Sequence, residues 1–198
     1  MERTLALMAV VLFATACTTL VYTARYDIGL SAVERRESGG ERKQFTDVHG
    51  HTFEDEFVRI TWTPLDTQLG LILVNKTDSS QRVIWDDIRY AGPDGKSDRV
   101  IHEGINIADR GLSMPPTVVI RGRTLLDLIE PTGHIDGYGK YDRPLIGSTS
   151  GGTEAEVRSK MVHGTIKVVL PIEVNGTIRE YLFQFSVGGD VVLSGWAS

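Results

Sequence analysis

The chain has 198 residues, of which 41% are hydrophobic and 24% are charged, and its formal net charge at pH 7 is −5. This balance is typical of a globular protein with one domain of standard size, and it excludes a collagen, a coiled coil and a wholly disordered chain. The acidic charge, without a long basic run, argues against nucleic acid as a partner, and the single cysteine excludes an internal disulfide and a cysteine metal cluster.

The first element in chain order is an apolar run at the N-terminus. Residues 4–16 are almost all apolar, and as a helix they would span about 20 Å. A bilayer core is ~30 Å thick, so the run is too short for a stable transmembrane helix but has the length of a signal-peptide core. We therefore predict a signal peptide over residues 1–16.

The end of this run resembles the lipobox of bacterial lipoproteins. The small residues Ala14-Thr15-Ala16 stand directly before Cys17. The resemblance implies cleavage before Cys17 and attachment of palmitate-type acyl chains to it, which would anchor the protein in a membrane. In the family, an aspartate after the cysteine retains the protein at the inner membrane. Thr18 stands there instead, so the resemblance implies an outer-membrane lipoprotein that faces the periplasm of the bacterial cell envelope. The alternative is a plain secretory signal cut near Ala16, with Cys17 left as a free thiol.

Residues 17–50 are predicted to be the lipidated N-terminus and a tether. Ser31–Lys43 is highly charged and contains two adjacent glycines, so it buries too little apolar surface to offset its ordering entropy. A flexible tether of ~30 residues would reach about 30 Å. The apolar residues within 20–30 leave two possibilities open: more tether, or a strand docked on the domain. The folded domain is predicted over residues 51–198.

The strongest local signal is a hairpin near the C-terminus. Asn175-Gly176 stands between two β-rich runs and predicts a type I′ turn, which needs positive φ at both positions. A two-residue turn pairs Val174 with Thr177, and a slip of one residue would turn every side chain to the other face. In this register Leu170 faces Tyr181, Val168 faces Phe183 and Ile166 faces Phe185, while Lys167 meets Gln184 and Thr165 meets Ser186 on the polar face.

The whole region from residue 51 onward is predicted to be all-β. Short apolar runs with turn signals about every ten residues predict eight or nine strands, with no convincing amphipathic helix between them. This spacing favours an antiparallel β-sandwich of immunoglobulin-like type, with a small barrel as the alternative. The stretch from Gly133 to about Val157 is rich in glycine and is predicted to be a long irregular loop, which is usually functional or mobile. Besides the hairpin, strands are expected at 58–62, 69–74, 83–90, 99–101, 118–120, 123–129 and 191–193.

The sequence assigns no catalytic residue, no metal and no cofactor. His49 and His51 provide two candidate ligands, which do not make a metal site. His102 and Glu103 have the chemistry of an acid and a base, but a polar strand end is the favoured interpretation. No G-x-S-x-G motif for a nucleophilic serine is present.

Paired carboxylates occur at Asp86-Asp87. Adjacent residues on a strand point to opposite faces, so these two cannot flank one glycosidic bond as a glycosidase requires. We expect Trp85 to be a core residue and the aspartates to cap a turn or to pair with Arg82 or Arg89.

The best candidate binding surface lies within the glycine-rich loop. Tyrosines interleaved with glycines and charges are typical of adaptable binding loops, because they put rigid aromatic area on a flexible backbone. The alternative is a mobile solvated loop without a ligand. The candidate binding residues are His134, Asp136, Tyr138, Tyr141 and Arg143.

These observations lead to one expected function and one alternative. The expected function is a non-enzymatic binding or adaptor role for an outer-membrane-anchored periplasmic lipoprotein, with an envelope protein or cell-wall glycan as its partner. The alternative is a periplasmic hydrolase that acts on a cell-wall or glycan substrate.

Overall fold

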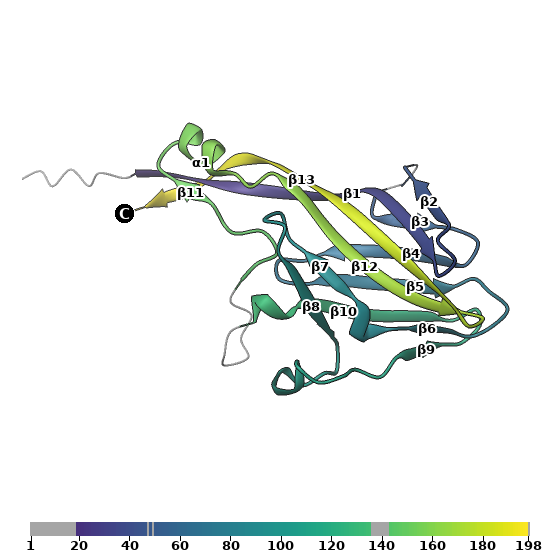
Figure 1. The fold of residues 1–198 in the computed structure, drawn as a ribbon. Coiled ribbons are helices and arrows are strands. Elements are labelled where there is room, and N and C mark those ends of the chain that lie inside the picture. Colours follow the sequence, from purple (N-terminus) through teal and green to yellow (C-terminus); the bar gives the residue numbers. More distant parts are fainter. Residues whose placement is uncertain (1–18, 47, 49, 136–142, 198) are drawn as a thin grey trace, which may run out of the picture.

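The computed structural model describes residues 19–46, 48, 50–135 and 143–197. These residues form thirteen strands in one sheet, with one short α-helix and three 3-10 helices (Figure 1). All the strand pairings are antiparallel, which confirms the predicted all-β class, and the described strands outnumber the eight or nine expected. The strands are β1 (Thr19–Glu37), β2 (Arg42–Phe45), β3 (Thr52–Glu54), β4 (Val58–Pro64), β5 (Leu69–Asn75), β6 (Gln81–Val83), β7 (Arg89–Ala91), β8 (Ser97–His102), β9 (Thr117–Val119), β10 (Thr124–Pro131), β11 (Ser150–Gly151), β12 (Gly164–Val174) and β13 (Thr177–Ala197). The helices are η1 (Trp85–Asp87), η2 (Ile107–Asp109), η3 (Thr132–His134) and α1 (Glu154–Lys160).

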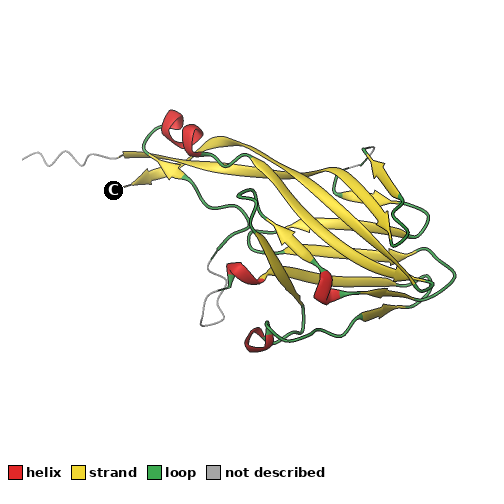
Figure 2. Ribbon diagram, in the orientation of Figure 1, coloured by secondary structure: helices red, strands yellow, loops and turns green. Residues whose placement is uncertain are grey.

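The sheet turns back on itself so that two groups of strands face each other. Its strand order is β11-β1-β13-β12-β7-β8-β10-β5-β4-β3, with β2 beside β1 and with β6 pairing both β12 and β9. Strand β8 joins the two groups, because it pairs with β7 on one side and β10 on the other. Figure 2 shows the long strands β1, β12 and β13 lying across β4, β5 and β10.

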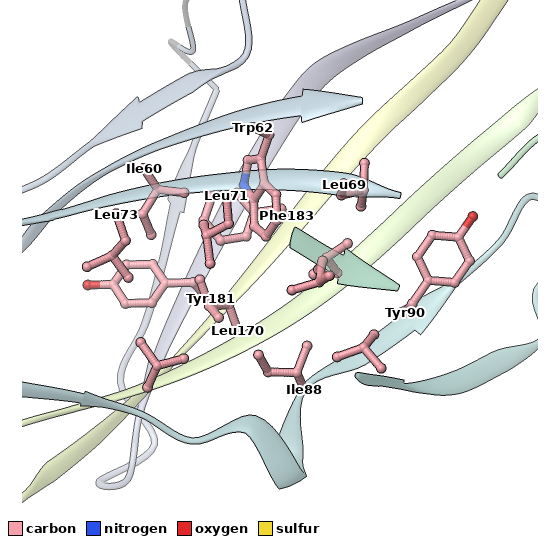
Figure 3. Packing of buried hydrophobic residues seen from close by; sticks show 14 of the residues in the cluster. Ile60, Trp62, Leu69, Leu71, Leu73, Ile88, Tyr90, Leu170, Tyr181 and Phe183 are labelled. Atoms are coloured by element: carbon pink, nitrogen blue, oxygen red, sulfur yellow. The ribbon is translucent and has the colours of Figure 1, made fainter. Parts of the chain in front are cut away.

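The hydrophobic core fills the space between these two groups. The ring of Trp62 on β4 lies 5.2 Å from that of Phe183 and 6.0 Å from that of Phe185, both on β13. Figure 3 shows Trp62, Phe183 and Tyr181 among the aliphatic side chains of β4, β5 and β12. In β4 and β5 the core residues come from alternate positions, as the period of two requires when one face of a strand is buried.

The predicted hairpin is confirmed in its turn and in its register. Strand β12 pairs with β13 from Val174 opposite Thr177 to Ile166 opposite Phe185, and the polar pairs also match. Asn175 has φ 52° and Gly176 has φ 76°, so both turn positions have the positive φ that a type I′ turn needs.

Residues 20–30, for which a docked strand was one of two possibilities, lie in a strand, and the prediction of a tether is wrong at 31–37 and at 42–45, which are also in strands. Residues 19–37 form the long strand β1, which pairs with β13 over almost its whole length, and β2 adds a further strand beside it. A register shift near Ser31 places Leu30, Val33 and Arg35 on the inner face, where all three are buried. The partner strand satisfies the backbone of this charged segment, so the predicted domain boundary at residue 51 falls inside the sheet.

The glycine-rich stretch is also more ordered than predicted. Its described part contains η3, β11 and α1. Helix α1 begins at the N-cap Thr153, whose hydroxyl accepts a hydrogen bond from the N–H of Glu156, and its buried Val157 packs with Ala24 and Met161. The helix has only seven residues, which is too short to show a clear helical period in the sequence. None of the described helices is long and apolar enough to cross a membrane.

Candidate binding groove

A cleft with a volume of about 640 Å³, within the range of ligand sites, lies among the described residues. It lies beside the first half of β1, and its other walls are the turn between β4 and β5 and the segment 144–148. These three walls come from distant parts of the chain. We call this cleft the groove.

The segment 144–149, which we call the strap, is held at both ends by backbone hydrogen bonds. The N–H of Leu145 donates to the carbonyl of Asp66 over 2.7 Å, and the N–H of Ala24 donates to the carbonyl of Thr149 over 2.8 Å. Leu145 is buried in the core, and its carbonyl accepts a hydrogen bond of 3.4 Å from the hydroxyl of Tyr90. The strap therefore links the β4–β5 turn to β1 and forms one rim of the groove.

Two aromatic residues of the groove are fixed by hydrogen bonds. The hydroxyl of Tyr26 lies 3.2 Å from Oγ1 of Thr149 and accepts a hydrogen bond of 3.0 Å from the N–H of Val162. Nε2 of His51 lies 2.6 Å from the carbonyl oxygen of Ile28, so this nitrogen carries a proton and donates it. Both rings are therefore held in place before any ligand arrives.

The charged side chains among the described residues that line the groove are acidic. Asp27 and Asp66 are exposed at its edge, and the described residues that line it include no lysine or arginine. The other lining residues are mainly prolines, aliphatic side chains and Tyr26. A cleft with apolar walls and a few carboxylates suits a ligand that presents apolar or aromatic area together with hydroxyl or cationic groups.

The structure brings two of the five predicted binding residues together. His134 ends η3 and packs edge-on against Tyr90, with ring centroids 5.7 Å apart. His134 and Arg143 both line a second pocket of about 300 Å³, which shares the strap residues 144–146 with the groove. Of the same prediction, Asp136, Tyr138 and Tyr141 lie outside the described residues.

Near the adjacent carboxylates Asp86 and Asp87, the predicted burial of Trp85 is confirmed, but the predicted ion pair is wrong. Trp85 is fully buried, as expected. Asp86 pairs with Arg99 over 2.9 Å rather than with Arg82 or Arg89. The Ser113 hydroxyl, a backbone N–H and Arg99 lower the pKa of Asp86. Residues 83–90 are not one strand, because the 3-10 helix η1 separates β6 from β7.

The histidines considered as metal ligands or as an acid and base lie in different surroundings. Among the described residues, no three side chains of histidine, cysteine, aspartate or glutamate gather as a metal site needs. His49 and Cys17 lie outside the described residues. His102 has an aspartate partner, since its Nδ1 lies 3.2 Å from Oδ2 of Asp127, and its ring stacks on Trp85 at 4.0 Å. Within the described residues, this pair makes no hydrogen bond to a serine or threonine hydroxyl.

A buried polar cluster that the sequence did not reveal lies at the far end of β1. Arg35 Nη1 lies 2.6 Å from Oδ2 of Asp55, and the hydroxyl of Tyr181 donates to the same oxygen over 3.0 Å. The other carboxylate oxygen accepts the N–H groups of Phe57 and Val58. Burial and the Asp55 carboxylate raise the pKa of Tyr181 well above its ordinary value. Each of these three side chains has a hydrogen-bond partner within the cluster, so we assign the cluster a structural role.

Comparison with protein-family models, with curated proteins and with solved structures gives no match for this chain. The geometry of the described residues is therefore the basis for the functional argument.

Proposed function

We propose that the protein is an outer-membrane lipoprotein whose β domain binds another component of the cell envelope in the groove. The observation that carries the proposal is the groove itself, an open cleft of about 640 Å³ with rigidly held aromatic side chains. Its mixture of apolar walls and few polar groups suits a segment of an envelope protein or a cell-wall glycan.

The position of the groove along β1 supports an anchored role. Strand β1 begins at Thr19, two positions after Cys17, and its start lies with the end of β13 and with α1 at one end of the molecule (Figure 1). Ala24, the first groove residue, comes five residues after Thr19, about 17 Å further along at ~3.3 Å per strand residue. Lipid chains on Cys17 would thus hold the groove close to the membrane surface, without the long tether.

The arrangement of the strands supports an open β-sandwich as the architecture. The strands that pack across the core, β1, β12 and β13 against β4, β5 and β10, have the two facing layers of such a fold. An immunoglobulin-like connectivity remains a proposal that an experimental structure with a bound partner would test.

Site-specific photocrosslinking in intact cells tests the groove. We expect a photoreactive residue at Leu65, which lines the groove and is 44% exposed, to give a specific adduct with an envelope component. The matched control is Leu126 on β10, which is 69% exposed and lines none of the clefts described above. Equal adduct patterns at the two positions would rule out the groove as the binding surface.

Metabolic labelling with palmitate tests the anchor separately. The wild type should be labelled and fractionate with the outer membrane, whereas Cys17→Ala should lose both properties. An unlabelled wild type would contradict the lipoprotein proposal and leave the groove proposal standing on the crosslinking result alone.

The hydrolase alternative has one supporting observation, the pairing of His102 with Asp127. A histidine held by an aspartate is part of many hydrolytic sites, but acyl transfer also needs a nucleophile within hydrogen-bond reach of the imidazole. The binding role is the better supported of the two. The groove is larger than the pocket at His102, and the two share no lining residue, so the groove does not depend on the His102–Asp127 pair.

A further inference from the structure

The groove borders a stretch of β1 whose outer edge has no neighbouring strand. Along this edge β11 pairs with residues 22–23 and β2 pairs with residues 33–36. Between these two segments, none of the described strands pairs with β1 on the side away from β13. Residues of this stretch, within 24–28, line the groove. An uncovered strand edge is a template for one more strand, and here it opens into the groove.

The register of the hairpin determines which backbone groups face the open edge. In a two-residue hairpin the closing pair, here Val174 and Thr177, is hydrogen-bonded, and such pairs alternate with non-bonded pairs along antiparallel strands. The odd-numbered residues of β13 therefore bond to β12, and the even-numbered ones bond to β1, among them Asp190, which lies opposite Arg25. Tyr26, one position further along β1, thus directs its N–H and its carbonyl away from β13.

Two hydrogen bonds at the ends of this stretch agree with that direction. The N–H of Ala24 donates to the carbonyl of Thr149 in the strap over 2.8 Å, and the carbonyl oxygen of Ile28 lies 2.6 Å from Nε2 of His51. Both groups belong to even-numbered residues, and both partners lie outside β13. Between them lie the N–H and carbonyl of Tyr26 and the N–H of Ile28, and these three groups make no hydrogen bond to another described residue outside β13.

The three open groups have the pattern that an added strand needs. A donor, an acceptor and a second donor follow one another along the edge, and the two donors lie two residues apart, about 7 Å at ~3.3 Å per residue. We infer that the groove takes up an extended segment of another polypeptide, which pairs with β1 at Tyr26 and Ile28 as an additional strand. This inference rests on the proposed function and narrows its envelope component to a protein, because a glycan has no backbone amides with which to continue the ladder.

The surroundings of the open edge restrict its occupant to a short segment. The strap and His51 close its two ends at Ala24 and Ile28, which are four residues apart, or about 13 Å. Strands β11 and β2 cover the edge on either side. A stretch of this length is too short for the edge-to-edge pairing of two folded sheets, so a second copy of this chain does not fit.

The walls of the groove indicate the side chains of the segment. Alternate side chains of a strand point to opposite faces. Those on the face of Tyr26 would meet the apolar walls at Leu65 and Ile146, and those on the other face would lie beside Asp27, which is exposed. The groove therefore favours a segment in which apolar residues alternate with basic ones.

Amide hydrogen exchange in the full chain, followed by NMR, first tests the open edge. Without a ligand, the N–H groups of Tyr26 and Ile28 should exchange faster than those of Arg25 and Asp27, which donate to β13. Arg25 and Asp27 are internal controls, because they lie in the same part of the same strand. Equal protection at all four amides would show that the edge is already covered and would overturn the inference.

A peptide titration then tests the added strand. The probe is an acetylated and amidated six-residue peptide of alternating valine and lysine. At a peptide concentration of about ten times Kd, exchange at Tyr26 and Ile28 should slow about tenfold, because these amides then exchange only from the ligand-free protein. Exchange at Arg25 and Asp27 should change much less. Absence of protection at Tyr26 and Ile28 would overturn the inference.

Two methylated peptides are the matched controls, one with N-methyl groups on its valines and the other with N-methyl groups on its lysines. Both keep the side chains of the probe, but alternate amides of a strand face opposite edges. We expect one of the two to lose the protection and the other to retain it. Loss with the methylated valines would indicate antiparallel pairing with β1, and loss with the methylated lysines would indicate parallel pairing. The same result with both methylated peptides would overturn the inference.

A sugar probe separates this inference from the proposed function. A tetramer of N-acetylglucosamine should leave exchange at Tyr26 and Ile28 unchanged. If the tetramer instead gave saturable shifts at Leu65 and Ile146 while the peptide gave none, the strand inference would be overturned and the groove would stand as a glycan site. A specific crosslink at Leu65 together with a peptide that fails to protect Tyr26 and Ile28 would likewise keep the groove and overturn the added strand.

Discussion

The strand pair β1–β13 runs through two very different ends of the molecule. At one end, which we call the closed end, the pair faces β3 and β4, and its residues Arg35 and Tyr181 bind the buried carboxylate of Asp55, which directly follows β3. At the other, the ribbon end, the same two strands pack with α1 in a small separate cluster whose buried members are Ala24, Val157 and Met161. The groove and the strap lie between the main core and the ribbon end. One continuous ribbon thus borders the large packed core at the closed end and, toward the ribbon end, the groove that we propose as a binding surface.

The largest effect is expected from removing the buried Asp55 carboxylate at the closed end. Asp55→Ala should lower the free energy of unfolding by about 3–5 kcal/mol, because it leaves the buried Arg35 without its main carboxylate. Urea unfolding followed by circular dichroism measures this change. Glu56→Ala is the control, since Glu56 also contacts Arg35 at 2.9 Å but has a side chain that is 51% exposed, and should cost about 0–1 kcal/mol. Similar losses for the two variants would show that burial of the pair does not stabilise this end.

The second prediction concerns the ribbon end. Val157→Ala should cost about 1–2 kcal/mol at that end through lost apolar burial. Hydrogen exchange should then quicken in the first residues of β1 and the last residues of β13, while amides around Arg35 stay protected. Val168→Ala makes the same change in the main core, where Val168 is fully buried, and should lower protection throughout the sheet. If Val157→Ala also weakened the closed end, the two ends would form one cooperative unit.

The distance along the chain between paired strands decides what the sequence could and could not predict. The hairpin was predictable because its turn and its pairing are adjacent in the chain, so Asn175-Gly176 fixes the register. Strand β1 was not, because its partner lies far along the chain: Glu37 bonds to Arg179, 142 residues away. From composition one can judge the entropy that this charged segment loses on ordering. The contacts with β13 that offset this loss cannot be judged from composition.

The candidate site was predictable only in part for the same reason. His134 and Arg143 stand in a run whose composition is typical of binding loops, and the structure places both beside the strap. The groove is made by β1, the β4–β5 turn and the strap, which meet only in the folded chain. No local pattern marks such a cleft, and the pairing of Arg35 with Asp55 is hidden in the same way.

A smaller effect is expected where the groove joins the ribbon end. Tyr26→Phe removes the hydroxyl that contacts Thr149 and accepts the N–H of Val162, and it should cost about 0.5–1.5 kcal/mol. Hydrogen exchange at Val162 should quicken. The matched control is Tyr22→Phe, because Tyr22 packs on the same small cluster and its hydroxyl makes no hydrogen bond within the described residues. Unchanged exchange at Val162 in Tyr26→Phe would mean that this hydroxyl does not hold the rim of the groove.

The smallest effect is a pH dependence at the surface of the closed end. Hydrogen bonds from Arg59 and Lys76 lower the pKa of Glu54 from 4.5 to about 2. Because the folded pKa is the lower one, the contribution of Glu54 to stability is fully present above pH 4.5 and is lost as the pH falls toward 2. The stability difference between the wild type and Glu54→Gln should therefore shrink between pH 5 and about pH 2, and added salt should reduce it at pH 6 because this carboxylate is exposed. Unfolding measured at several pH values checks this, and because Lys160 also lowers the pKa of Glu156, Glu156→Gln should show a pH dependence in the same direction at the ribbon end. A difference that stayed constant with pH would mean that the charge of Glu54 contributes nothing to the stability of the closed end.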